Sequence, residues 1–212
     1  MITFEEAKEL SKGYKVVPIS MEIMSDIRTP MQVLRILKGV SSHCYMLESV
    51  ENQEKWGRYT FLGYDPKLEI TCTNGVMKVK NGKTEISEVK HPGEKIKEIL
   101  KEYTSPNIKE LPTFTGGLVG YFSYDYIKYS EPKLNLDADD EEGFKDVDLM
   151  LFDKVIAFDN FSQKIIVIAN AKTDNLEEDY NKCVDEINKI IELIKTGEMV
   201  DVNPGKITSE FR

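Results

Sequence analysis

The residues best suited to chemistry lie close together, in a stretch that runs from residue 45 to residue 66. Glu48 and Ser49 supply a carboxylate and a hydroxyl, and Arg58 and Tyr59 supply a guanidinium and a phenol. Groups of this kind can bind a charged small molecule through ion pairs and hydrogen bonds. The spacing alone favours an ordinary β-hairpin with a polar edge, so these residues need further support before they define a site.

Two neighbouring strands, at residues 43–50 and 58–64, are expected to carry these groups. The polar segment 51–55 fits a hairpin connection, and Asp65-Pro66 is a turn signal that ends the second strand. Side chains alternate between the two faces of a strand. Glu48 therefore faces one way with its neighbours two residues away, whereas Ser49 faces the other way with Tyr45 and Leu47.

The sequence contains signals for four helices. Thr3 and Glu6 form a capping box before a short helix that reaches about residue 12. Thr29-Pro30 repeats the start signal for a helix that ends at Gly39. Apolar residues at helical spacing predict two more helices, at about 96–103 and 176–195.

The remaining segments predict strands and turns. Asn-Gly dipeptides at 74–75 and 81–82 separate three alternating segments, which indicates an antiparallel meander. Residues 114–121 should form a glycine-rich strand followed by a short helix, 134–148 a solvated acidic loop, and 149–158 and 164–171 two further strands. The order of elements lacks βαβ alternation and predicts an α+β fold, a largely antiparallel sheet with helices packed on it.

Composition excludes several classes of protein. The 28 basic and 37 acidic residues give a formal charge of -9, without a basic stripe for nucleic acid or an anionic membrane. No apolar run approaches the ~20 residues that a spanning helix needs, and the residues after Met1 do not predict a secretory leader. The three cysteines are far apart and fit a reducing cytoplasm.

Other candidate motifs fail on spacing. His43 and His91 have no serine or cysteine partner at a recognisable spacing. The glycines of 114–121 are not followed by the Gly-Lys-Ser/Thr of a phosphate loop, and they fit a strand bulge or a close backbone approach instead. The acidic run 137–142 lacks the ligand spacing of a calcium loop. These residues alone therefore build no catalytic constellation.

Four motifs, in order, give the chain a family resemblance. Leu47-Glu48-Ser49, the run 56–66 (WGRYTFLGYDP), the run 112–125 (PTFTGGLVGYFSYD) and the run 151–159 (LFDKVIAFD) resemble the N-terminal region of anthranilate synthase component I. Thr29-Pro30 agrees with that resemblance, which covers essentially the whole chain. Aminodeoxychorismate synthase component I shares the architecture, and the Leu-Glu-Ser and Gly-Arg-Tyr runs look more like the anthranilate branch.

The resemblance implies a role in tryptophan biosynthesis. The full-length enzyme is expected to be a cytoplasmic lyase that converts chorismate and ammonia to anthranilate and pyruvate with Mg²⁺, the ammonia coming from a glutamine amidotransferase subunit (component II). The chorismate and magnesium residues of that family lie in a C-terminal catalytic domain, so residues 1–212 should be catalytically silent. We expect a regulatory domain at 1–197 and a linker toward the catalytic domain at 198–212.

The resemblance also implies a feedback site for L-tryptophan. The Leu-Glu-Ser element matches Leu47, Glu48 and Ser49, with Ser49 most closely tied to the inhibitor, and the Thr-Pro element places Pro30 nearby. Arg58 and Tyr59 are added as neighbours on the next strand, although Arg58 could equally pair with another strand residue. Two alternatives to the anthranilate branch are component I of aminodeoxychorismate synthase and a free-standing amino-acid-binding module.

Overall fold

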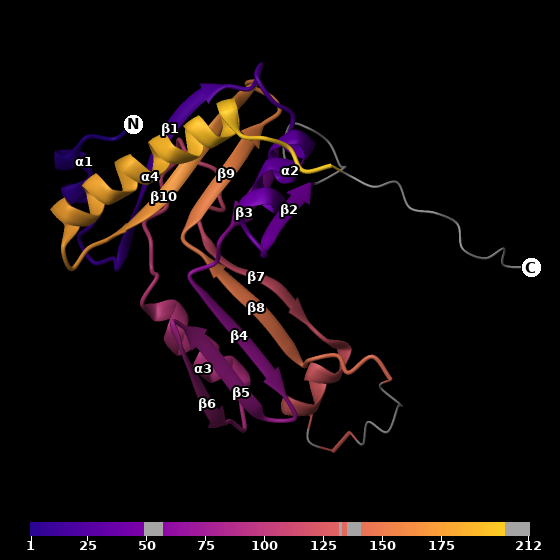
Figure 1. Ribbon diagram of the computed structural model, residues 1–212. Coiled ribbons are helices and arrows are strands. Elements are labelled where there is room, and N and C mark those ends of the chain that lie inside the picture. The colour runs from indigo at the N-terminus through magenta and orange to yellow at the C-terminus, as the bar shows by residue number, and fades with distance from the viewer. Residues whose placement is uncertain (49–56, 132, 135–140, 202–212) are drawn as a thin grey trace, which may run out of the picture.

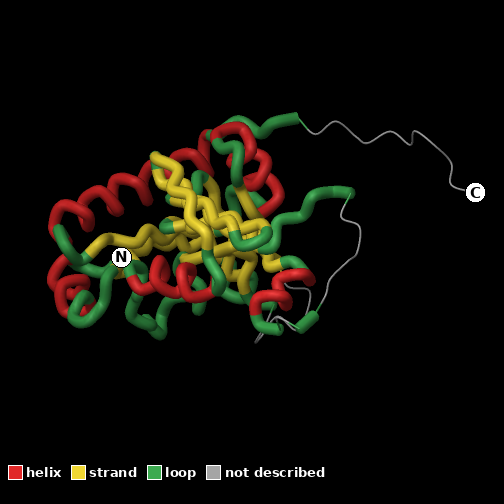
Figure 2. Tube along the Cα trace, turned by 90° about the horizontal axis from the view of Figure 1, so that it is seen from below, coloured by secondary structure: helices red, strands yellow, loops and turns green. Residues whose placement is uncertain are grey.

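The chain folds into two antiparallel sheets of five strands each (Figure 1). The computed structural model describes residues 1–48, 57–131, 133–134 and 141–201. The strand order is β1-β10-β9-β3-β2 in the first sheet and β6-β5-β4-β8-β7 in the second. Seen from below, the strands occupy the middle of the molecule and the helices lie around them (Figure 2). The prediction of an α+β fold with antiparallel pairing is confirmed.

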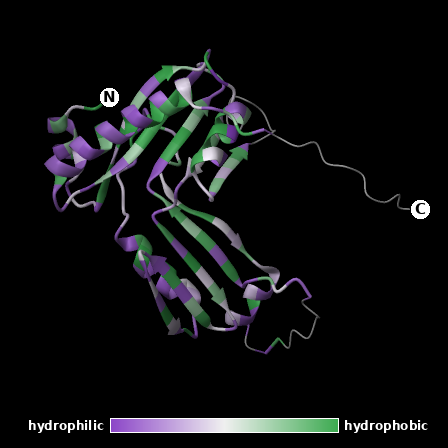
Figure 3. Cartoon of the chain, viewed as in Figure 1, coloured by the Kyte–Doolittle hydropathy of each residue, from purple (hydrophilic) through white to green (hydrophobic). Residues whose placement is uncertain are grey.

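Three helices cover one face of the first sheet. The long helix α4 lies along β10 and β1, whereas α2 packs on β2 and β3 and α1 on β1. The buried apolar residues between these helices and the sheet form the largest core, and the outward side of α4 is hydrophilic (Figure 3). The elements are α1 (Phe4–Leu10), β1 (Val16–Met24), α2 (Pro30–Val40), β2 (Cys44–Glu48), β3 (Tyr59–Tyr64), β9 (Lys154–Asp159), β10 (Lys164–Lys172) and α4 (Leu176–Thr196).

The second sheet carries the predicted meander. Asn74 and Gly75 both have positive φ, 50° and 78°, as the tight turn between β4 and β5 requires. A second core lies on this sheet, with Ile96 of the helix α3 buried in it. The elements are β4 (Leu68–Thr73), β5 (Val76–Asn81), β6 (Lys83–Glu88), α3 (Pro92–Lys101), β7 (Gly117–Phe122), the 3-10 helix η1 (Tyr124–Tyr129) and β8 (Val147–Phe152).

Local signals in the sequence are confirmed at several elements. Capping boxes are present at Thr3 with Glu6 and at Thr29 with Gln32. Gly197 follows the last residue of α4 as expected. A Cβ atom at Gly120 would collide with the backbone of β8, which explains why glycine is needed in β7.

The prediction of one strand over residues 149–158 is wrong. The structure has two strands there, and they belong to different sheets, β8 to the second and β9 to the first. Asp153 lies between them, and its carbonyl oxygen accepts hydrogen bonds from the backbone N–H and the side-chain Nδ2 of Asn170, both at 2.9 Å. Because the residues on both sides of Asp153 are mostly buried and apolar, hydropathy alone does not reveal the change of sheet.

Two predicted loop segments extend beyond the described residues. The acidic loop was expected to end at residue 148, but β8 already begins at Val147 because that side chain joins the second core. Residues 135–140 of that loop and 202–212 of the predicted linker lie outside the described residues. Just before residue 202, the chain is linked to α2, because Nε of Arg35 donates a hydrogen bond to the carbonyl oxygen of Val200 at 2.9 Å.

Candidate functional site

The predicted tryptophan-binding residues centre on the hairpin of β2 and β3. β2 is the edge strand of the first sheet, and its register pairs Leu47 with Phe61 and Glu48 with Thr60. Leu47 is 49% exposed, and Glu48 is also exposed. Ser49 lies, with residues 50–56, outside the described residues, so its predicted role stays a prediction.

The predicted alternation along β2 is confirmed for the residues that can be followed. Met46 packs into the core beneath the helices. Tyr45 points to the opposite face, where its ring meets that of Phe152 edge-on, with 4.7 Å between the centroids. Leu47 shares the face of Tyr45, because residues two apart in a strand point the same way. Glu48 is therefore on the side of α2.

The face of the first sheet that carries Leu47 is apolar and is covered by a loop. Its buried centre consists of Val155, Ala157, Ile166 and Ile168. The loop residues Leu111 and Phe114 and the strand residues Tyr59 and Phe61 pack around that centre and stay partly exposed. The rings form a continuous chain, with centroid distances of 5.7 Å from Tyr59 to Phe61 and 5.6 Å from Phe61 to Phe114.

Arg58 is anchored at the end of this face by a neighbouring strand. Its Nε donates to Oδ1 of Asp159 at 3.0 Å, and its Nη2 donates to Oδ2 at 2.6 Å. The guanidinium also lies over the ring of Tyr59, 5.0 Å from the centroid. Asp159 is the register partner of Tyr59 on β9, so the alternative of a salt bridge to a strand neighbour is present in the structure.

Within the pair of Arg58 and Asp159, the pKa of the Asp159 carboxyl is strongly lowered. Burial by itself would raise the pKa of the Asp159 carboxyl, but hydrogen bonds from Arg58 and Ser162 outweigh it and hold the pKa well below its usual range. Burial raises the pKa of the Tyr59 phenol, which therefore stays neutral at physiological pH. A fixed cation beside a neutral aromatic surface can bind a carboxylate that carries an aromatic group.

Pro30 belongs to the same part of the molecule but not to the same face. It is the first residue of α2, which packs on β2 and β3 from the side of the helical core. The structure therefore places Leu47 and Tyr59 on one face of the sheet, with Arg58 next to Tyr59 in the chain. Glu48 and Pro30 lie on the side of α2.

Sequence reasoning missed three residues of this region. Phe61 and Phe114 complete the aromatic surface, and Asp159 fixes Arg58. Alternation within β3 could have indicated Phe61, because it lies two residues from Tyr59. Asp159 and Phe114 are far away in the sequence, and their positions depend on strand order, which no local pattern encodes.

Within the described parts of the chain, no group of three or more His, Cys, Asp or Glu side chains is arranged to hold a metal ion. None of the helices described is both long and apolar enough to cross a membrane. The three cysteine thiols are free.

Comparison with known proteins defines the class. A family model described as chorismate binding enzyme matches residues 42–210, which is most of the chain. This chain therefore belongs to the family of chorismate binding enzymes.

Individual relatives are more specific. Anthranilate synthase component 1 of Acetivibrio thermocellus is 36% identical over 191 residues, an alignment that covers 89% of this chain and 38% of the relative. The protein of the same name from Aquifex aeolicus is 34% identical over 196 residues, with 92% and 40% covered. The chain thus spans about two fifths of the length of these curated relatives.

A solved structure shows the same fold. The crystal structure of anthranilate synthase component I from Streptococcus pneumoniae superimposes with a TM-score of 0.55 at 25% identity, covering 83% of this chain and 37% of that one. The expected N-terminal fold of this family is confirmed.

Proposed function

We propose that this chain is the N-terminal, tryptophan-binding part of an anthranilate synthase component I. The full-length protein would be a lyase of tryptophan biosynthesis that acts on chorismate and ammonia in the cytoplasm. Mg²⁺ and chorismate would bind to a C-terminal catalytic domain, and a glutamine amidotransferase subunit would supply the ammonia. Residues 1–212 alone would not catalyse the reaction.

The main support is the extent of the similarity to relatives named anthranilate synthase component 1. Two of them align with about nine tenths of this chain, and the chain accounts for about two fifths of each.

The geometry near β2 supports the choice of ligand. L-tryptophan offers an indole, a carboxylate and an ammonium, and a binding site must provide a partner for each. The aromatic face with Leu47, Tyr59 and Phe61 suits the indole. Arg58 uses Nε and Nη2 to bind Asp159, which leaves Nη1 to donate to a carboxylate. Ser49 would complete the polar contacts.

The position of this region suits feedback control. Leu47 and Glu48 are exposed on an edge strand, so a second domain can pack over them. An inhibitor that binds between two domains favours one arrangement of those domains over another, which is the requirement for allosteric inhibition. The coupling is typically about 1 to 3 kcal/mol.

A substitution in the full-length enzyme tests the proposal. Ser49→Phe would fill the space that the ligand needs, so the inhibition constant for L-tryptophan should rise at least about tenfold, equivalent to ~1.4 kcal/mol. The turnover number with chorismate should stay within about a factor of two, because catalysis resides elsewhere in the proposal.

Ser87→Phe is the matched control. Ser87 is an exposed strand residue of β6, in the second sheet, so the same change there should leave inhibition unaltered. Equal inhibition constants for Ser49→Phe and the parent enzyme would contradict the proposed tryptophan site. Aminodeoxychorismate as the product of the full-length enzyme would contradict the anthranilate branch.

A further inference from the structure

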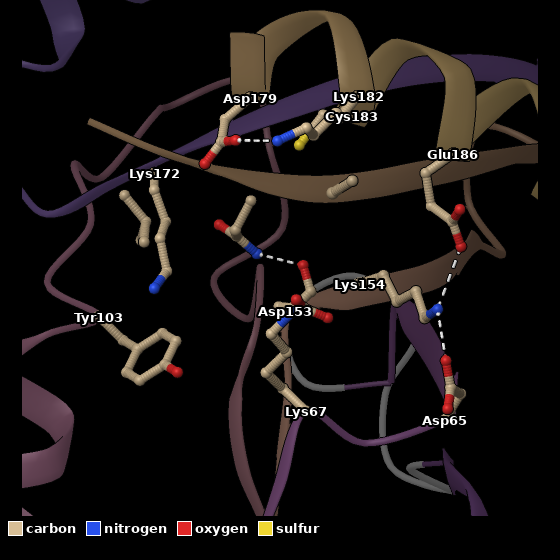
Figure 4. A pocket seen from close by; sticks show the side chains of 13 residues that line it. Asp65, Lys67, Tyr103, Asp153, Lys154, Lys172, Asp179, Lys182, Cys183 and Glu186 are labelled. Atoms are coloured by element: carbon tan, nitrogen blue, oxygen red, sulfur yellow. Dashed lines mark hydrogen bonds and ion pairs between the residues drawn. The ribbon is translucent and has the colours of Figure 1, made fainter. Parts of the chain in front are cut away.

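A polar cavity of about 450 Å³ lies at the junction of the two sheets, away from the hairpin of β2 and β3. The first sheet, the helix α4 and the segment between β3 and β4 contribute to its walls (Figure 4). Its volume falls within the range of ordinary small-molecule sites, ~300 to 1,000 Å³. The charged residues that line it are Asp65, Lys67, Asp153, Lys154, Lys172, Asp179, Lys182 and Glu186.

Most of these charges are already paired. Lys154 binds Asp65 at 3.0 Å and Glu186 at 3.1 Å. Lys182 binds Asp179 at 3.2 Å and also pairs with Glu178 one turn away. These ion pairs lie along the side of the cavity formed by α4 and β9, and a ligand would have to break them in order to use their charges.

Three charged groups in the cavity have no partner among the described residues. The carboxylate of Asp153 and the ammonium groups of Lys67 and Lys172 form no ion pair and no hydrogen bond to another side chain there, and the Asp153 carboxylate accepts only from its own backbone N–H. Figure 4 shows Lys67 and Asp153 close together at the centre, with the ammonium of Lys172 and the ring of Tyr103 facing them from the other side. Burial raises the pKa of the Asp153 carboxyl, and Lys67 and Lys154 oppose that effect only in part.

Two neutral groups complete the unpaired set. Tyr103 has a hydroxyl without a partner among the described residues, and burial raises its pKa. Asn170 is held in place because its Nδ2 donates to the carbonyl oxygens of Thr115 at 2.7 Å and of Asp153 at 2.9 Å. Its Oδ1 accepts no hydrogen bond within the described chain, so it remains available as a fixed acceptor.

We propose that this cavity binds a small acidic amino acid of the size of L-glutamate, with its carboxylates at Lys67 and Lys172 and its ammonium at Asp153. The unpaired groups carry a net charge of +1, from two ammonium groups and one carboxylate. A dicarboxylic amino acid has the complementary set, two negative charges and one positive charge. The oxygen of Asn170 accepts a second hydrogen bond from the ammonium, and the hydroxyl of Tyr103 donates to a carboxylate.

Desolvation explains why this match matters. A half-buried carboxylate without an ion-pair partner destabilises a protein, and a ligand ammonium removes that penalty on binding. A neutral or purely anionic ligand leaves Asp153 unpaired in a more desolvated cavity, so it gains less. This proposal does not depend on tryptophan binding near Ser49, so either proposal can be refuted without affecting the other.

Calorimetric titration of the chain with L-glutamate at pH 7.5 tests the proposal. We expect saturable binding, and L-glutamine and glutarate should bind at least about tenfold more weakly, because each lacks one of the matched charges. Asp153→Asn and Lys172→Gln should each weaken L-glutamate binding at least about tenfold. Both substitutions preserve side-chain size closely, and circular dichroism checks that the variants are folded.

Lys97→Gln serves as the control, since Lys97 is exposed on α3 and does not line the cavity. This variant should bind L-glutamate with unchanged affinity. The proposal is overturned by the absence of saturable heat with L-glutamate, by glutarate binding as tightly as L-glutamate, or by unchanged binding in both cavity variants. A loss of binding in Lys97→Gln equal to that in Lys172→Gln also overturns it.

Discussion

Replacing Asp159 by alanine should lower the free energy of unfolding by about 3 kcal/mol, because this carboxylate organises the end of β9. Its side chain is only 3% exposed. It accepts hydrogen bonds from Arg58 Nε and Nη2, from the backbone N–H groups of Phe161 and Ser162, and from the Ser162 hydroxyl. All five bonds are lost in the alanine variant.

The expected loss of stability depends on how many of these hydrogen bonds water can replace in the variant. A hydrogen bond to a charged group contributes about 1.5 to 3 kcal/mol. Phe161 and Ser162 are exposed, so water can take over their donors in the variant. The Arg58 side chain is 40% exposed, which reduces the contribution of the ion pair. The equivalent of one or two strong bonds is therefore lost, about 3 kcal/mol in total.

Arg58→Ala should have a smaller effect, about 1 to 2 kcal/mol. In this variant Asp159 keeps the three donors from Phe161 and Ser162, so its charge is still partly satisfied. Comparing the stability losses of the two variants shows whether Asp159 acts mainly through Arg58 or also through the donors of Phe161 and Ser162. If Asp159 mainly serves Arg58, the two substitutions should be equally harmful.

The pH dependence has a defined sign. The pKa of Asp159 is lower in the folded chain than the unfolded value of about 3.9. Its stabilising effect is therefore complete above about pH 5 and declines as the pH falls below the unfolded pKa. The difference between parent and Asp159→Ala should shrink correspondingly.

Urea unfolding followed by circular dichroism, at pH 7 and again at pH 3.5, measures both effects. The reasoning would be refuted by a loss of less than about 1 kcal/mol for Asp159→Ala at pH 7. A difference between parent and variant that is as large at pH 3.5 as at pH 7 would also refute it, as would a larger loss for Arg58→Ala.

Three further substitutions probe other features. Tyr45→Phe removes a buried hydroxyl that has no partner among the described residues and should stabilise the chain by about 1 kcal/mol in urea unfolding; destabilisation would contradict this. Gly120→Ala adds a methyl group where φ is +152° and the Asp148 carbonyl oxygen blocks it, so the melting temperature should fall by several degrees, and an unchanged value would contradict this. Asp153→Asn should stabilise the chain at pH 7, because the raised pKa makes the ionised carboxyl costly. That gain should disappear as the pH falls through the raised pKa toward about 3.9, and a gain unchanged by pH would contradict it.

Local sequence signals predicted the elements well, because each depends on a few neighbouring residues. Thr3 and Thr29 each form a capping box with the residue three positions later in the chain. Asn74 and Gly75 form their turn with positive φ. The division of the strands between two sheets could not be predicted from such local signals. On both sides of Asp153 the strands carry mostly buried side chains, and only long-range pairing assigns β8 to β4 and β7 and assigns β9 to β3 and β10.

The candidate site shows the same limit. The family resemblance indicated Leu47, and Arg58 and Tyr59 were added as neighbours on the next strand. It did not indicate that Asp159 would hold Arg58, since these residues are 101 positions apart. The cavity at the sheet junction was missed altogether, because Lys67 and Lys172 come from distant strand ends that only the folded chain brings together.

The junction cavity and the proposed tryptophan region are connected through the same two strands. β3 and β9 pair from Tyr59 with Asp159 to Leu62 with Ile156. The tryptophan region lies at the first end of this ladder. At the other end the chain enters β9 from Asp153, and Lys154 binds Asp65 just beyond β3. The ligand proposed at Asp153 would therefore act on the same pair of strands that positions Arg58. If both ligands bind, any coupling between them must be reciprocal, so each changes the affinity of the other by the same factor.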